Sequence, residues 1–246
     1  MKRRGTGLAT SSGMLFRQLF DRDSSTYTYL LADERSGEAL LIDPVLEQVD
    51  RDLQLVSDLG LRLALVLDTH VHADHVTGAG ALRARTGAAT ISGVGGPGCA
   101  DRLVRAGEVL RVGGVELEVI ATPGHTDDSI SYRAADRVFT GDALLIRAAG
   151  RTDFQNGDAG QLYDSISARL FTLPDATLVY PAHDYRGLTV STIGEEKRFN
   201  ARIAGKTREE FVTVMSSLRL PAPHRIHEAV PANRACGMAA TLPVQG

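Results

Sequence analysis

The chain contains no tryptophan and only two cysteines among its 246 residues, and aromatic side chains make up 5% of it. Cys99 and Cys236 are far apart in the sequence, and neither belongs to a Cys-x-x-Cys pair. The sequence therefore indicates neither a disulfide framework nor a thiolate zinc site. We expect Cys236 to be an ordinary thiol, and the protein to belong to a reducing compartment.

Long apolar runs and a large excess of charge are also absent. No apolar stretch approaches the ~20 residues that cross a membrane, so no membrane association is expected. The formal net charge is −3, and nothing indicates a nucleic-acid surface. The basic start of the chain has no apolar segment behind it and is not typical of a secretory signal. We expect a disordered leader at residues 1–13 and one domain at residues 14–246. The expected location is cytoplasmic for a bacterial source, with mitochondrial as the option for a eukaryotic one.

The hydrophobic pattern predicts strands and helices in alternation. Strands are predicted at residues 27–31, 39–42, 63–67, 88–91, 109–112, 115–121, 129–133, 137–140 and 177–180. Helices are predicted at residues 45–59, 73–85 and 158–171, and after a capping box at 207–210. The tail from Pro221 onward is expected to be irregular. Strands in pairs between helices imply two sheets covered by helices, which is an α/β arrangement.

Three histidines and an aspartate lie within six residues, directly after the strand predicted at 63–67. They are His70, His72, Asp74 and His75. Imidazole and carboxylate groups are common ligands of zinc, iron and manganese. Three unrelated surface histidines would be the alternative. It is disfavoured because the chain has only seven histidines, and two more of them, His125 and His183, also follow predicted strands.

Three further candidates follow predicted strands in the same way. His125 occurs in Pro-Gly-His, Asp142 occurs in Gly-Asp, and His183 occurs in Pro-Ala-His. Each of these segments alone is compatible with a plain turn. Because layered α/β proteins place their sites at the carboxyl ends of strands, we expect all the candidates to belong to one site.

With these positions the chain resembles the metallo-β-lactamase superfamily. The matching signature is His70-x-His72-x-Asp74-His75, followed by His125, Asp142 and His183. The resemblance implies a four-layer αββα sandwich, with the metal site at one edge between the two sheets.

The chain also resembles one particular branch of this superfamily. The matching segments are residues 41–47, 140–147, 150–155, 180–185 and 230–233. They resemble the persulfide dioxygenases of the ethylmalonic-encephalopathy protein type. The segment Gly-Arg-Thr-Asp-Phe-Gln at 150–155 discriminates this branch best, and the likeness covers residues 15–237.

The spacing of the candidates alone suggests a hydrolase with two metal ions. One ion would be held by His70, His72 and His125, the other by Asp74, His75 and His183, with Asp142 as a bridge. Two zinc ions in these places would activate a water molecule between them. This alternative corresponds to a hydroxyacylglutathione hydrolase of the glyoxalase II type.

The narrower resemblance implies a different chemistry. In persulfide dioxygenases a single iron(II), one per chain, is held by the residues that match His70, His125 and Asp142. Two histidines and one carboxylate leave positions open for substrate and oxygen. The implied reaction oxidises glutathione persulfide with O₂ and water to glutathione and sulfite. The remaining candidates then become outer groups that orient the ligands, and these are His72, Asp74, His75 and His183.

The same resemblance assigns substrate-binding residues and partners. Arg151, Tyr185 and Arg202 match positions that bind the substrate, and arginine suits the carboxylates of glutathione through its paired N–H donors. No sulfurtransferase-like second domain is recognised, so a sulfurtransferase partner would be a separate chain. A homodimer is one option for the oligomeric state.

Overall fold

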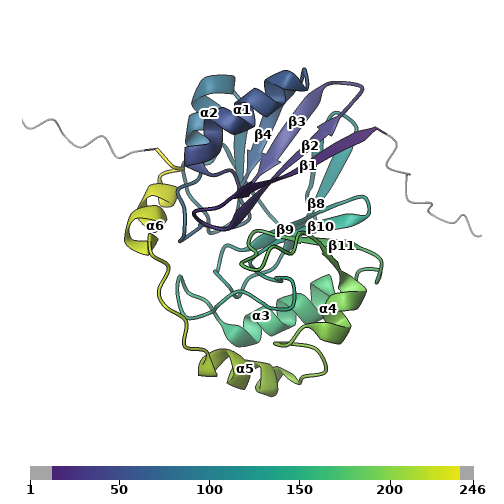
Figure 1. Cartoon of the computed structure of the whole chain (residues 1–246), viewed down its shortest axis with the longest axis vertical. Coiled ribbons are helices and arrows are strands. Elements are labelled where there is room, and N and C mark those ends of the chain that lie inside the picture. The colour runs from purple at the N-terminus through teal and green to yellow at the C-terminus, as the bar shows by residue number, and fades with distance from the viewer. Residues whose placement is uncertain (1–12, 239–246) are drawn as a thin grey trace, which may run out of the picture.

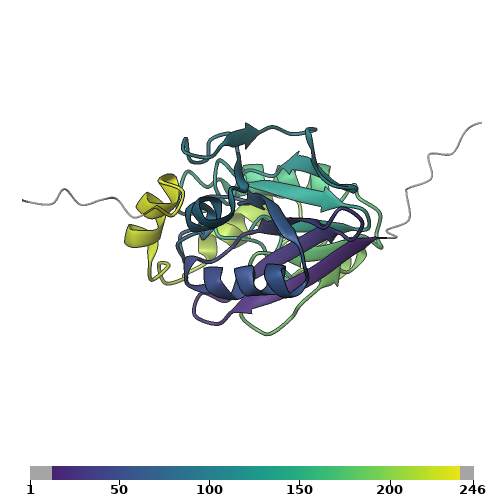
Figure 2. The same ribbon diagram turned by 90° about the horizontal axis from the view of Figure 1, so that it is seen from above.

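Two six-stranded sheets are stacked face to face, with helices on both outer faces, in the computed structural model of the chain (Figure 1). The structure describes residues 13–238, so the leader expected at residues 1–13 lies outside the described residues except for Gly13. Figure 2 shows the same ribbon from above, with α6 at one side of the molecule.

The first sheet has the strand order β1-β2-β3-β4-β5-β6. Its strands are β1 (Met14–Asp21), β2 (Thr26–Asp33), β3 (Glu38–Ile42), β4 (Arg62–Leu67), β5 (Ala89–Gly93) and β6 (Arg102–Val104). The pairs from β1 to β3 are antiparallel and those from β3 to β6 are parallel. The carboxyl ends of the parallel strands therefore meet at one edge of this sheet.

The second sheet has the order β12-β11-β10-β9-β8-β7. Its strands are β7 (Val109–Val112), β8 (Val115–Ala121), β9 (Ile130–Ala134), β10 (Arg137–Gly141), β11 (Leu178–Pro181) and β12 (Ser191–Thr192). Only β10 and β11 run parallel. Their carboxyl ends bring residues 142 and 183 to the same edge.

The helices form the outer layers. They are η1 (Leu46–Gln48), α1 (Val49–Asp58), α2 (Ala79–Thr86), α3 (Ala159–Ser165), η2 (Ile166–Leu170), α4 (Ile193–Phe199), α5 (Arg208–Ser217) and α6 (Ile226–Arg234). Helices α1 and α2 pack on the first sheet, and α3 to α5 pack on the second. Helix α6 lies at the side of the sandwich in both views (Figures 1 and 2). Within residues 13–238, no helix has the length and apolar character needed to cross a membrane.

Alternation along the strands explains the layers. Successive side chains of a strand point to opposite faces. In β2, Leu31 packs in the core between the sheets, whereas its neighbour Leu30 packs beneath α1 and α2. In β10, Phe139 belongs to the central core and Val138 to the core beneath α3. Both sheets are thus apolar on two faces, and the αββα sandwich expected from the sequence is confirmed.

Several elements differ from the sequence prediction. The predicted helix at 73–85 begins only at Ala79, because residues before it hydrogen-bond elsewhere: the carbonyl of Val76 accepts from the amide of Leu46 at 2.8 Å, and the amide of Gly78 donates to Pro44 at 2.8 Å. The short strands β6 and β12 and the helix α4 were not predicted. Segments of two or three residues carry too little periodic pattern to be recognised.

The tail is not irregular as expected, since it contains α6. This helix includes Pro231, which interrupts its hydrogen bonding, and it is stabilised by the burial of Ala229 and Asn233 against the rest of the protein. Short helices generally depend on such packing more than on their own propensity. The proline content of the segment was therefore a misleading signal.

The expectation for the cysteines is wrong. Cys99 and Cys236 form a disulfide between the loop after β5 and the end of α6. The chain returns to this loop after 137 residues, and only the fold reveals that approach. The inference of a reducing compartment rested on unpaired cysteines and loses its basis.

A prediction concerns Asp52, which is fully buried in α1 beside Arg51. Burial raises the pKa of Asp52 to about 6 in spite of the neighbouring guanidinium. Between pH ~4 and ~6 the folded protein retains a proton on this group that the unfolded chain releases, so stability falls as the pH rises through this window. The total loss is about 2–3 kcal/mol from two pKa units.

The variant Asp52→Asn should lack this pH-dependent loss of stability, because the amide does not titrate. Urea unfolding at a series of pH values would show the free energy of unfolding of the variant gaining ~2–3 kcal/mol relative to wild type between pH ~4 and ~7. Parallel curves for the two proteins would contradict the assignment.

Candidate metal centre

The loop of residues 68–77, here called the ligand loop, follows β4 and carries the cluster of histidines. Its main chain is held by buried side chains from elsewhere in the sequence. Asp43 accepts from the amide of Thr69 at 2.7 Å, Asp128 accepts from the amide of Val71 at 2.9 Å, and Gln155 donates to the carbonyl of Val71 at 2.6 Å. A loop buried in this way needs such partners, because unpaired backbone groups are costly. The loop is therefore rigidly placed.

His125 reaches the ligand loop from the turn after β8. Gly124 has φ +133, and a Cβ atom there would lie 2.3 Å from the amide nitrogen of Leu162. Only glycine fits this conformation and this contact. The imidazole Nδ1 lies 2.7 Å from the carbonyl oxygen of Arg151 and donates to it, so Nε2 carries the free lone pair. Gly150 allows the approach, since a Cβ there would lie 2.8 Å from Nδ1 of His125.

His70 is oriented by a similar bond. Thr69 donates its hydroxyl to Asp43 at 2.9 Å, and its oxygen lies 3.0 Å from Nδ1 of His70. The hydroxyl proton is already committed, so Nδ1 of His70 must be the donor and Nε2 remains free. Both histidines therefore present the nitrogen that a metal ion requires.

Asp142 completes a group of three donors with His70 and His125. One ligand atom from each lies within 4.8 Å of the other two. The distance from Nε2 of His125 to Oδ2 of Asp142 is 3.6 Å. The other oxygen of Asp142, Oδ1, accepts from Nδ1 of His183 at 2.7 Å. Oδ2 is thus left to the site, and the three donors fit one metal ion.

The charge states of the group suit a metal ion as well. Burial, together with the neighbouring histidines, holds the pKa of His70 well below its usual range, so the imidazole is neutral. Burial alone would raise the pKa of Asp142, but His183, His125 and His70 outweigh it and lower that pKa. Metal ions bind neutral imidazole and ionised carboxylate, so no proton has to leave these two groups.

A second group of candidates lies beside the first, formed by His72, Asp74, His75 and His183. Its donors also converge within 4.8 Å, but Asp74 is hydrogen-bonded to His75 and His183, and His72 is hydrogen-bonded to Asp43. Oδ2 of Asp74 lies 2.8 Å from Nε2 of His183 and 2.9 Å from Nδ1 of His75. Nε2 of His72 lies 3.1 Å from Oδ1 of Asp43. Nδ1 of His72 and Nε2 of His75 are buried without a partner.

His183 lies between two carboxylates and uses both ring nitrogens. Burial alone would lower its pKa, but Asp142 and Asp74 raise that pKa well above its usual range. An imidazolium donates from both nitrogens and has no lone pair for a metal ion. In this arrangement both ring nitrogens of His183 are taken up by hydrogen bonds to Asp142 and Asp74.

The structure brings all seven candidates of the sequence analysis into one buried site. It also adds supporting residues that the sequence did not reveal, and these are Thr26, Thr69, Asp128 and Asn233. Asp43, Gln155 and Asn233 lie in segments that had been singled out for their resemblance, and Thr69 directly precedes His70, so a signal existed for these residues. Thr26 and Asp128 have no distinctive neighbours in the sequence.

The sequence resemblance assigns three residues to substrate binding, namely Arg151, Tyr185 and Arg202. The ring of Tyr185 stacks on His183 with the two planes 5° apart and the centroids 6.1 Å apart, and the tyrosine is 72% exposed. The guanidinium of Arg202 donates to the carbonyl of Ala149. Arg151 is bound by Asp153 at 2.7 and 2.8 Å and donates to the carbonyl of Pro221. Arg202 therefore has donors to spare, whereas most donors of Arg151 are already used.

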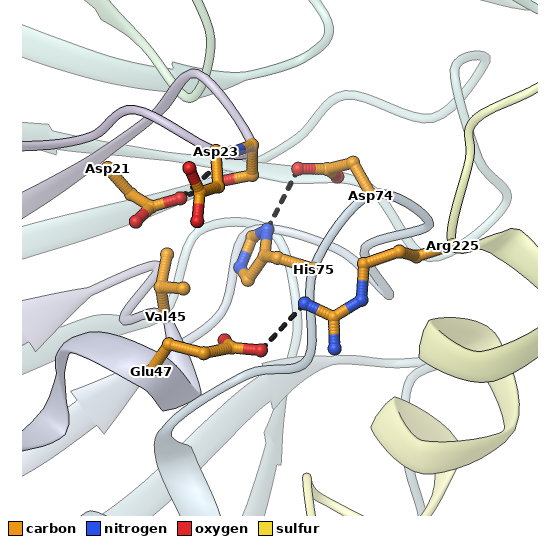
Figure 3. Close-up of a pocket in the computed structure, with 8 residues that line it drawn as sticks. Asp21, Asp23, Val45, Glu47, Asp74, His75 and Arg225 are labelled. Atoms are coloured by element: carbon orange, nitrogen blue, oxygen red, sulfur yellow. Dashed lines mark hydrogen bonds and ion pairs between the residues drawn. The ribbon is translucent and has the colours of Figure 1, made fainter.

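A small acidic pocket adjoins the far side of His75 (Figure 3). Its lining includes Asp21, Asp23 and Glu47, and Arg225 of the segment before α6 forms an ion pair with Glu47 at 2.7 Å across it. The pocket lies behind the ligand loop, so it connects α6 to the site without opening onto the three metal donors.

The fold and the site together define a class of metalloprotein. The family described as "Metallo-beta-lactamase superfamily" matches residues 21–96 and 99–183. The chain belongs to the metallo-β-lactamase superfamily.

Comparison with individual proteins shows to which family within the superfamily the chain belongs. The chain is 50% identical to "Persulfide dioxygenase ETHE1, mitochondrial" of Mus musculus, over 94% of this chain and 91% of that protein. It is 65% identical to the crystal structure of ETHE1 from Myxococcus xanthus, with a TM-score of 0.90, over 91% of this chain and 100% of that one. A hydroxyacylglutathione hydrolase of Polaromonas sp. is 41% identical, over 65% of this chain and 62% of that protein. Within the superfamily, the chain therefore belongs to the persulfide dioxygenase family.

The variant His125→Ala should lose the metal while the fold survives. His125 supplies one of three donors and lies on a turn outside the cores, so its removal leaves two ligands. Metal content of the purified variant, with circular dichroism as the control for folding, measures the effect. Retention of the full metal content would show that His125 is not a ligand.

Proposed function

We propose that this protein is an iron(II)-dependent dioxygenase that oxidises glutathione persulfide with O₂ and water to glutathione and sulfite. The observation that carries the proposal is the donor set of two histidines and one carboxylate, His70, His125 and Asp142. Such a set is typical of iron(II) oxygenases and leaves positions for substrate and oxygen. Membership of the persulfide dioxygenase family supports the same reaction.

The residues around the donors have defined tasks in this proposal. Bound iron(II) would activate O₂ beside the terminal sulfur, and that sulfur would supply the four electrons that reduce O₂ as it is oxidised to sulfite. The carbonyl of Arg151 and the hydroxyl of Thr69 hold the two imidazoles in the required tautomer. His183 fixes the orientation of Asp142 and keeps it ionised.

The glutathione part of the substrate would be bound by Arg202, Tyr185 and Arg151. Arg202 is the strongest candidate for a carboxylate of glutathione, because within residues 13–238 it makes no ion pair. Burial lowers its pKa, and a bound carboxylate would offset that cost. Arg151 would have to release Asp153 before its side chain could bind a carboxylate. Tyr185 lies over His183 and would border the persulfide end.

The second candidate is a zinc hydrolase with two ions acting on an acylglutathione. It is favoured by the convergence of His72, Asp74, His75 and His183 and by the similarity to hydroxyacylglutathione hydrolase. The hydrogen bonds among these four residues disfavour it, because His183 would have to release two carboxylates and a proton.

Partners and location follow from the proposed reaction. A sulfurtransferase that supplies the persulfide is the proposed partner. The relatives named mitochondrial are animal proteins, so a mitochondrial location applies to this chain only if its source is eukaryotic, and a cytoplasmic one if it is bacterial. A homodimer is proposed as the oligomeric state.

Oxygen uptake tests the proposed reaction. Protein loaded with iron(II) should consume O₂ and form sulfite when glutathione persulfide is added, and zinc-loaded protein should not. Hydrolysis of an acylglutathione by the zinc form, without oxygen uptake by the iron form, would favour the hydrolase instead.

The variant His183→Ala separates the two candidates by metal stoichiometry. With a single iron, the variant should retain most of the metal but lose activity by about 10–100-fold, because Asp142 loses its orienting partner. With two zinc ions, the same change removes a direct ligand and the metal content should fall from two ions to one. Such a fall would contradict the dioxygenase.

The variant Arg202→Ala tests substrate binding. Loss of hydrogen bonds to a charged group costs about 1.5–3 kcal/mol, so KM for glutathione persulfide should rise about 10–100-fold while kcat changes little. Arg198→Ala is the matched control, because this arginine is exposed on the nearby α4. Equal KM values for the two variants would remove Arg202 from the binding site.

A further inference from the structure

Helix α6 is attached to the back of the metal centre at both of its ends. Before the helix, Arg225 pairs with Glu47 across the acidic pocket beside His75 (Figure 3). At its end, Asn233 is buried against the ligand loop, and two residues beyond the helix Cys236 is joined to Cys99. The metal ligands do not belong to α6, yet α6 contacts the loop that carries them.

Both polar atoms of the Asn233 side chain form hydrogen bonds with the ligand loop. Its amide nitrogen donates to the carbonyls of His72 at 2.9 Å and His75 at 2.8 Å, and its oxygen accepts from the amide of Thr77 at 2.8 Å. The residue is 3% exposed. Three bonds from one buried side chain hold the ligand loop at His72, His75 and Thr77, and the first of these residues is two positions after His70.

The disulfide holds Asn233 in this position. The backbone at Cys236 has φ +58, a conformation that a non-glycine residue adopts only when its surroundings impose it. The carbonyl of Cys236 accepts from the amide of Gly80 at 2.9 Å, and a Cβ atom on Gly80 would lie 2.5 Å from that oxygen. The end of α6 is therefore packed tightly against the start of α2, and the covalent link to Cys99 keeps it there.

We propose that Asn233 is a positioning residue for the metal centre and that the Cys99–Cys236 disulfide makes its hold on the ligand loop dependent on the thiol redox state. With the disulfide intact, the three bonds of Asn233 keep His70 aligned with His125 and Asp142. When a dithiol reduces it, the S–S bond breaks, two cysteine thiols form, and the dithiol becomes a cyclic disulfide. The end of α6 is then held by noncovalent contacts alone, and the metal is released faster. This inference rests on the three-donor metal site and not on the identity of the substrate.

Cobalt(II) provides a test that does not depend on turnover. Its affinity is measured by competition with a chelator, and its visible spectrum reports the ligand geometry. Asn233→Ala should weaken cobalt binding by about 10–100-fold, the usual effect of losing a group that orients ligands, and should change the spectrum. Asn233→Asp should weaken cobalt binding in the same way, because it keeps the acceptor for Thr77 but loses both N–H donors. This second variant keeps the proposal testable if the alanine variant fails to fold.

The matched control is His227→Ala, which alters an exposed residue of the same helix and removes a surface histidine. Its cobalt affinity should equal that of wild type. If the Asn233 variants fold and bind cobalt within twofold of this control, Asn233 is not a positioning residue.

The redox part of the proposal is tested on the same proteins. Wild type is reduced with dithiothreitol, freed of it without exposure to air, and assayed for two new thiols. Cobalt should then dissociate several-fold faster, the variant Cys99→Ser should behave like reduced wild type, and Asn233→Ala should not respond to reduction. Unchanged dissociation after verified reduction would overturn the redox dependence.

Discussion

His183 lies between two carboxylates, and the character of the metal centre depends on that placement. One ring nitrogen lies 2.7 Å from Asp142 and the other lies 2.8 Å from Asp74. The two carboxylates keep the imidazole protonated, and the imidazolium in turn lowers the pKa of Asp142. One oxygen of Asp142 is thereby directed away from the second group of donors. The site becomes asymmetric, with three converging donors on one side and, on the other, four residues that are hydrogen-bonded through Asp74 or to Asp43.

This asymmetry is maintained by residues outside the two donor groups. Asp43 binds Thr69 and His72 together, so one carboxylate sets the tautomer of His70 and occupies the nearest outer histidine. The segment at 150–157 holds His125 through a main-chain carbonyl and holds the ligand loop through Gln155. A mononuclear site on this fold therefore depends on hydrogen bonds to the ligands as much as on the ligands themselves.

The sequence predicted the architecture and the members of the site, because both leave strong local patterns. Strand alternation revealed the sheets, and histidines at strand ends revealed the donors. The division of those donors into ligands and orienting residues could not be read from spacing, since His183 occupies the same place in the sequence under either alternative. Its role depends on the distances to Asp74 and Asp142, which lie 109 and 41 residues away.

Helix α6 and the disulfide escaped prediction for a related reason. Pro231 suggested an irregular tail, whereas burial of Asn233 against a loop 156 residues earlier stabilises a helix there. Long-range packing of this kind overrides local propensity and has no counterpart in the sequence near the residue concerned. The ion pair between Arg151 and Asp153 likewise could not be read from the motif that indicates substrate binding by Arg151.

The central claim is that one metal ion is bound by three residues while the four neighbouring candidates keep their hydrogen bonds, His72 to Asp43 and the other three through Asp74. Anomalous diffraction at the iron absorption edge, from crystals of iron-loaded protein, tests this claim most directly. The account predicts one anomalous peak, bordered by Nε2 of His70, Nε2 of His125 and Oδ2 of Asp142, with His183 still between its two carboxylates. A second peak of comparable height among Asp74, His75 and His183 would contradict it.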